Sequence, residues 1–84
     1  MNMTDVVREL SAQIRALRQA DRQPYAALLG SVPYAAVQST IRSDGSLWIP
    51  DPDRSDAQHT TVLELKVERS DDINEIRVRA LGQR

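Results

Sequence analysis

The last third of the chain carries the clearest alternation of hydrophobic and polar positions. Within "TTVLELKVERSDDINEIRVRAL" the apolar positions are Leu63, Leu65 and Val67 in a first run and Ile76, Val78 and Ala80 in a second. A period of two is typical of strands with one buried face, so the pattern predicts strands at about 60–69 and 75–81. A hairpin with a four-residue loop, Asp71 to Asn74, would join them and set Glu68 opposite Arg77.

The first 30 residues instead show helical spacing. Four apolar residues recur at intervals of 3, 4 and 3, namely Val7, Leu10, Ile14 and Leu17. This is the stripe of an amphipathic helix, predicted over about 4–22 with Thr4 as its N-cap. Pro24 suits a first helical position and Gly30 suits the position just past a helix end, which predicts a second, short helix at about 24–30.

The middle of the chain, "TIRSDGSLWIP", contains an Asp-Gly turn signal and the single tryptophan. A three-residue loop with Gly45 in the left-handed conformation sets Ile41 opposite Leu47. One face is then shared by four apolar residues, Val37, Ile41, Leu47 and Ile49. This register predicts strands at about 34–42 and 46–50, with Trp48 on the other face.

Together these elements predict an α+β fold in a single small domain, residues 1–84. An N-terminal helix and a short second helix would pack on a four-stranded antiparallel β-meander. A chain of this length is near the lower limit for an independent core, so we expect a homodimer or another protein partner. The strand at 75–81 is the predicted pairing edge, because a meander leaves its outer strands unpaired.

A winged helix is the alternative interpretation. The stretch "YAALLGSVPYAAVQSTIRSDG" can be read as a helix-turn-helix whose second helix starts at Pro33, with the late hairpin as the wing. Its candidate recognition helix supplies only one basic residue, Arg42, which is poor anchoring for phosphate. The net charge of −1 gives no overall attraction to DNA either. Nucleic acid is therefore allowed as a partner but not favoured.

The chemistry-bearing residues do not form a catalytic pattern. His59 is the lone histidine, and no nucleophile and base are set around it. The loop "DPDRSDAQHTTV" resembles a calcium loop but has Asp56 and Val62 where that loop needs glycine and glutamate. We expect no enzyme, no catalytic residue, no cofactor and no metal site. The chain has no cysteine, and its first residues contain no apolar run for a signal peptide or membrane span, so the expected location is cytoplasmic.

Trp48 is the strongest functional candidate. On a polar sheet face it has the character of an interface residue, and the predicted protein-binding residues are Trp48, Arg42, Thr40, Arg77 and Arg79. A structural interpretation stays open: Trp48 could lie over Arg42 in a cation–π contact or be covered by the acidic loop. The sequence favours a small non-catalytic accessory or regulatory protein that binds another protein or itself. The alternatives are a winged-helix DNA-binding regulator and a non-catalytic subunit of a larger enzyme complex.

Overall fold

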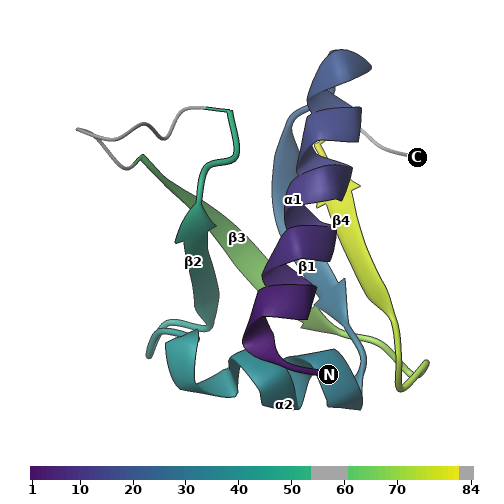
Figure 1. Ribbon diagram of the computed structural model, residues 1–84, viewed down its shortest axis with the longest axis vertical. Helices are drawn as coiled ribbons and strands as arrows, with labels where there is room; N and C mark the ends of the chain where they lie inside the picture. The colour runs from purple at the N-terminus through teal and green to yellow at the C-terminus, as the bar shows by residue number, and fades with distance from the viewer. Residues whose placement is uncertain (54–60, 82–84) are drawn as a thin grey trace.

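A computed structural model describes residues 1–53 and 61–81 of the chain, and these ranges form two α-helices and one four-stranded sheet (Figure 1). The elements in chain order are α1 (Met3–Gln19), β1 (Pro24–Leu29), α2 (Ser31–Val37), a 3₁₀ turn η1 (Gln38–Thr40), β2 (Ser46–Pro50), β3 (Val62–Arg69) and β4 (Ile76–Ala80). His59 and most of the acidic loop lie outside the described residues. Among the described residues, no helix combines the length and apolar character needed to cross a membrane.

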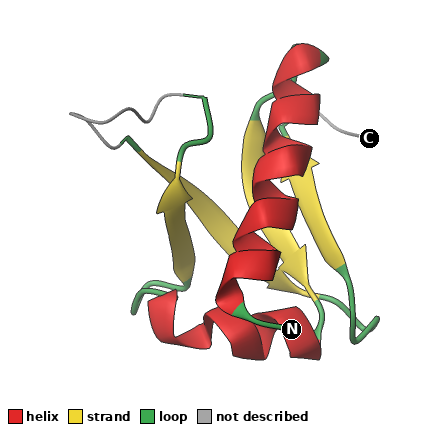
Figure 2. Ribbon diagram, viewed as in Figure 1, coloured by secondary structure: helices red, strands yellow, loops and turns green. Residues whose placement is uncertain are grey.

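The sheet is mixed, with strand order β2-β3-β1-β4. β1 runs parallel to β3 and antiparallel to β4, and β2 runs antiparallel to β3. α1 lies across one face of the sheet, and α2 packs at one end of it (Figure 2). The predicted α+β fold is thus confirmed, but the predicted antiparallel meander is wrong, because β1 lies between β3 and β4.

The short helix predicted at 24–30 is a strand instead. β1 occupies a central place in the sheet, and both Ala26 and Ala27 are 0% exposed. Alanine and leucine are good helix formers, but a short apolar run does not distinguish a buried strand from a helix by its period. Pairing with strands on both sides decides the outcome here, so tertiary context overrides local preference.

The direct hairpin between β3 and β4 is also wrong. Leu28 of β1 is the register partner of both Glu68 and Arg77, so these two residues are separated by a strand. The loop after β3 instead crosses the end of β1 and is tied there by backbone hydrogen bonds, from Gly30 to the Glu75 carbonyl at 2.9 Å and from Val32 to the Ile73 carbonyl at 3.0 Å.

The strand predicted at 34–42 is likewise wrong, because Ser31–Val37 is α-helical and Gln38–Thr40 continues as a 3₁₀ turn. Val37 still faces the core, at 0% exposed, and Ile41 still pairs with Leu47 as a single β-bridge. A spacing of four residues fits both the period of a strand and that of a helix. The winged-helix alternative is not observed either, because Pro24–Leu29, where its first motif helix would lie, is a strand, and β3 and β4 do not pair as a wing.

The core lies between α1 and the sheet. Its buried residues are Val6, Leu10 and Ile14 from α1, Val37 from α2, and Ala27, Leu29, Leu47, Ile49, Leu65 and Val78 from the sheet. α1 begins after Asn2, whose side-chain oxygen accepts the Asp5 amide at 2.9 Å, and it ends where Asp21 adopts a positive φ of 59°. The Arg22 amide bonds back to the Leu17 carbonyl at 2.8 Å, which closes the helix three residues before the predicted end at residue 22.

Both edges of the sheet are engaged by other parts of the chain. At β4, the Gln13 side chain of α1 donates to the Ile76 carbonyl and accepts the Val78 amide, each at 2.7 Å. At β2, the Arg42 amide donates to the Ser46 carbonyl at 2.9 Å. β2 ends at Pro50, which has no N–H to offer. The predicted pairing edge, β4, is therefore partly occupied by the protein's own helix.

Candidate functional site

β2 has the register that the turn signal predicts. Gly45 has a φ of +85°, and Ile41 pairs with Leu47 across the turn. Leu47 and Ile49 are 1% and 2% exposed, whereas Trp48 between them is 42% exposed. This alternation confirms that Trp48 points away from α1, onto the opposite face of the sheet.

Trp48 is supported on that face by a cation. The Arg42 guanidinium carbon lies 4.0 Å from the centroid of its ring. Glu64 of β3 is the cross-strand register partner of Trp48. The cation–π contact of the structural interpretation is thus present, but it leaves much of the indole in solvent.

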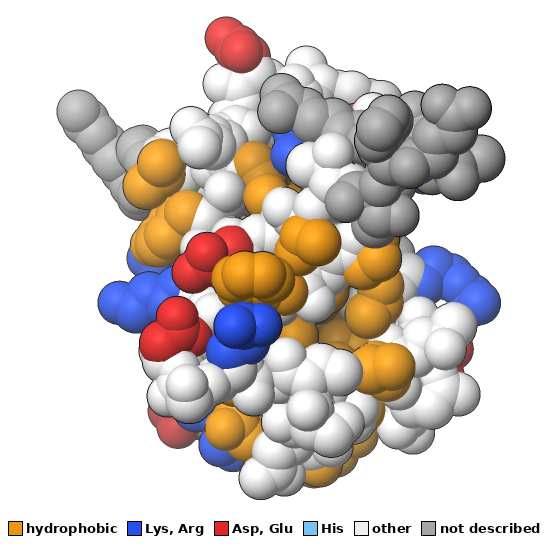
Figure 3. All heavy atoms as spheres, turned by 90° about the vertical axis from the view of Figure 1, so that its left-hand side faces the viewer, with side chains coloured by type: hydrophobic (Ala, Val, Ile, Leu, Met, Phe, Trp, Pro, Cys, Tyr) orange, Lys and Arg blue, Asp and Glu red, His pale blue; other side chains and the backbone are white. Residues whose placement is uncertain are grey.

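The face that bears Trp48 is the outer side of all four strands, and we call it the open sheet face. Its residues are Ser46, Trp48 and Pro50 on β2; Val62, Glu64, Lys66 and Glu68 on β3; Tyr25, Ala26 and Leu28 on β1; and Arg77 and Arg79 on β4. Both described helices pack against the opposite side of the sheet or its end (Figures 1 and 2). A view onto the β2 side shows hydrophobic side chains set among acidic and basic ones (Figure 3).

Beside Trp48 the open sheet face is hollowed. A hollow of about 460 Å³ is lined by Tyr25, Asp44, Gly45, Ser46, Glu64 and Lys66. Asp44 is fixed at the rim of this hollow, because its carboxylate accepts hydrogen bonds from the Ser46 hydroxyl at 2.6 Å and from the Ser46 amide at 3.0 Å. These bonds, the hydroxyl bond foremost, hold the pKa of Asp44 below its ordinary value.

Besides Asp44, whose carboxylate is bonded by Ser46, two charged residues line this hollow. Glu64 and Lys66 are both exposed and stand two residues apart on β3. Within the described residues neither takes part in an ion pair. Next to an exposed indole, the hollow therefore presents one acidic and one basic group that form no ion pair with the described part of the chain.

The residues predicted as a binding set are only partly brought together. Arg42 contacts Trp48, but Thr40 lies in η1, where its hydroxyl donates to the Val37 carbonyl at 2.8 Å. Arg77 and Arg79 lie on the open sheet face but on β4, with β3 and β1 between them and β2. Arg79 pairs with Glu68 at 2.9 Å, and this pair raises the pKa of Arg79.

Sequence reasoning missed the hollow. The positions of Pro24 and Gly30 predict a helix that includes Tyr25, and this prediction does not place Tyr25 beside β3. Asp44 and Ser46 could have been found from the Asp-Gly-Ser sequence, since aspartate commonly bonds the backbone two residues on in a turn.

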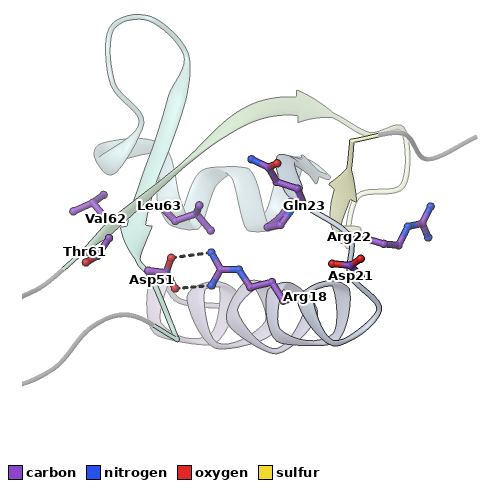
Figure 4. Close-up of a pocket in the computed structure, with 9 residues that line it drawn as sticks. Arg18, Asp21, Arg22, Gln23, Asp51, Thr61, Val62 and Leu63 are labelled. Atoms are coloured by element: carbon purple, nitrogen blue, oxygen red, sulfur yellow. Dashed lines mark hydrogen bonds and ion pairs between the residues drawn. The ribbon is translucent and has the colours of Figure 1, made fainter.

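A larger hollow, about 720 Å³, lies at the C-terminal end of α1 and is lined in part by Arg18, Arg22, Gln23 and Asp51 (Figure 4). Its most buried charges bind each other: Arg18 meets both carboxylate oxygens of Asp51, at 2.6 and 2.8 Å, and also Asp53 at 2.7 Å. The pKa of Arg18 is raised, first by the bond to Asp51. Asp51 is 2% exposed, so this bridge ties the end of β2 to α1 and is structural in character.

In the ranges 1–53 and 61–81, no cluster of three or more His, Cys, Asp or Glu side chains could hold a metal ion. No protein-family pattern, curated protein sequence or solved structure matches this chain significantly.

Proposed function

We propose that this chain is a small, non-catalytic accessory or regulatory protein of the cytoplasm that binds another protein, or itself, through the open sheet face around Trp48. The observation that carries the proposal is the 42% exposure of Trp48 on a sheet face that no described element covers. Tryptophan is enriched among the residues that dominate protein interfaces.

The surroundings of Trp48 support this proposal. Arg42 stacks on the indole and restrains it, which lowers the entropy that binding would otherwise cost. Tyr25 lines the adjacent hollow, and Glu64 and Lys66 supply unpaired charges beside it. An aromatic centre with charged groups at its margin is the usual anatomy of an interface.

Replacing Trp48 by alanine tests the proposal. We expect the isolated domain to lose no more than about 1 kcal/mol in urea unfolding, since the side chain is largely on the solvent side. The affinity for a partner purified from the native host should fall by about 2 kcal/mol or more, which is roughly 30-fold. Ile73→Ala is the matched control, because Ile73 is 58% exposed on the loop between β3 and β4, away from the open sheet face.

Tryptophan fluorescence gives an independent reading. The dilute, partner-free protein should emit like a water-exposed indole, and the emission should shift to the blue when partner is added. A blue emission in the dilute monomer, together with a loss of about 3 to 5 kcal/mol in Trp48→Ala, would assign Trp48 to the core and overturn the proposal.

A further inference from the structure

We infer that the occupant of the open sheet face is a second copy of this chain, related by a two-fold axis that runs across the strands at the level of Leu47 and Leu65. This inference rests on the proposed function and names its partner. It places the contact on the face of the sheet rather than on the edge strand β4.

The engaged edges favour a face-to-face contact. Gln13 already bonds the outward Ile76 carbonyl and Val78 amide of β4, at 2.7 Å each. The outer side of β2 is bonded by Arg42 at its start and ends in Pro50. Adding a strand to either edge would break these bonds or meet a residue without an N–H. The open sheet face can be covered without breaking any of them.

The strand register makes this face self-complementary. Trp48 is level with Glu64, and Ser46 is level with Lys66. Consider a two-fold axis that runs perpendicular to the strands, midway between these two register pairs. It places the Trp48–Glu64 pair of one chain opposite the Ser46–Lys66 pair of the other. Trp48 of each chain then lies over Ser46 of the other, which lines the hollow. The anchor and its receptor are thus both present on one chain.

The same two-fold rotation also pairs Glu64 and Lys66 of the two chains with each other. Glu64 of each chain comes opposite Lys66 of the other, giving two reciprocal ion pairs. Neither of these charges takes part in an ion pair within the described part of the chain, whereas the carboxylate of Asp44, the third charged residue of the hollow, is bonded by Ser46. Covering the face with a second copy therefore pairs both charges instead of burying them alone, which would be costly.

The size of the face sets the strength of the dimer. Strands of five to eight residues in a four-stranded sheet give a contact at the small end of specific interfaces, below about 1,200 Å² in total. We therefore expect a weak dimer, populated over about 10 μM to 1 mM protein.

Charge exchange tests the register. In sedimentation equilibrium, the wild-type chain should pass from monomer to dimer as its concentration rises. Glu64→Lys and Lys66→Glu should each weaken the dimer about tenfold or more, because each sets like charges opposite each other twice. An equimolar mixture of the two single variants should associate again, within about threefold of the wild type, since the mixed pair restores both attractions. Asp71→Lys is the control for Glu64→Lys, with the same change of charge on an exposed loop residue outside the face.

The mixture makes the test independent of any folding defect, because a misfolded variant cannot be rescued by its counterpart. A wild-type chain that stays monomeric to about 1 mM, or a dimer that neither single variant weakens, would overturn the inference. The proposed function would survive that result if Trp48→Ala still abolished binding to a different protein from the host. The proposed function would be overturned by a different result, namely blue emission of the dilute monomer together with a large loss of stability in Trp48→Ala.

Discussion

Gln13 offers the sharpest test of how the sheet is sealed. Its side-chain amide donates to the Ile76 carbonyl and accepts the Val78 amide, both at 2.7 Å, and so continues the hydrogen-bond ladder of β4 with a single residue of α1. Gln13→Ala removes both bonds and leaves the two backbone groups facing water at a partly buried position. The change also removes the exposed bond from the Gln13 side chain to Glu9, at 3.1 Å, but it deletes no buried apolar group, so its effect reports mainly the edge.

The magnitude follows from two hydrogen bonds. Each contributes about 0.5 to 1.5 kcal/mol net, while alanine regains a few tenths of a kcal/mol of helix propensity over glutamine. We expect Gln13→Ala to lower the free energy of unfolding by about 1 to 2 kcal/mol, which is roughly 4 to 16 °C in Tm for a domain of this size. Gln13→Glu keeps an acceptor for Val78 but has no donor for Ile76, and it adds a charge near Glu9, so its loss should be at least as large.

The assay is urea unfolding combined with hydrogen exchange. The Val78 amide should exchange faster in both variants, while Gln19→Ala, the same change at an exposed site at the end of α1, should alter stability by under about 0.5 kcal/mol. With its edge exposed, Gln13→Ala should also associate beyond a dimer. Unchanged stability with unchanged exchange at Val78 would refute the view that Gln13 seals β4.

Two further predictions concern the turns beside the sheet. Gly30→Ala should destabilise by about 3 kcal/mol in urea unfolding, because an added Cβ would overlap the backbone of Asp72 and Ile73; a loss under about 1 kcal/mol would contradict this close approach. Ser46→Ala should raise the pKa of Asp44 toward its ordinary value, measured by NMR titration. The lowered pKa of Asp44 contributes stability that is fully present above the pKa of the unfolded chain, near about 4, and that is lost as the pH falls through the lower pKa of the folded state. The wild type should therefore lose more stability on acidification than Ser46→Ala. Parallel curves of stability against pH for the two proteins would count against the bond.

Local patterns were enough for the elements that their own neighbours determine. The 3.6-residue stripe of α1 predicts its buried face, and Leu10 and Ile14 are both 0% exposed. The Gly45 bulge predicts the pairing of Ile41 with Leu47, since only that register buries a continuous apolar set. From this register alone the orientation of Trp48 could be predicted.

The strand order could not be predicted in this way. β1 joins the sheet through register pairs such as Ala27 with Val67 and Ala27 with Val78. These partners are far apart in sequence, so the hydrophobic pattern of residues 24–29 gives no sign of them. The alternation in β3 and β4 correctly marks their apolar faces. It does not reveal that another strand lies between them, because alternation reports the face of a strand and not its neighbour.

That inserted strand also divides the open sheet face into two unlike halves. Arg79 of β4 reaches across β1 to pair with Glu68 of β3, at 2.9 Å. Both arginines of β4 on this face are therefore paired within the chain, Arg79 with Glu68 and Arg77 with Glu75. The half over β2 and β3 keeps an exposed indole, and its Glu64 and Lys66 form no ion pair among residues 1–53 and 61–81. A hairpin of β3 and β4 would have gathered Arg77 and Arg79 directly beside these groups. The observed order instead holds Arg77 and Arg79 away from Glu64 and Lys66. The exposed indole of Trp48 and these two charges therefore lie together on the neighbouring strands β2 and β3.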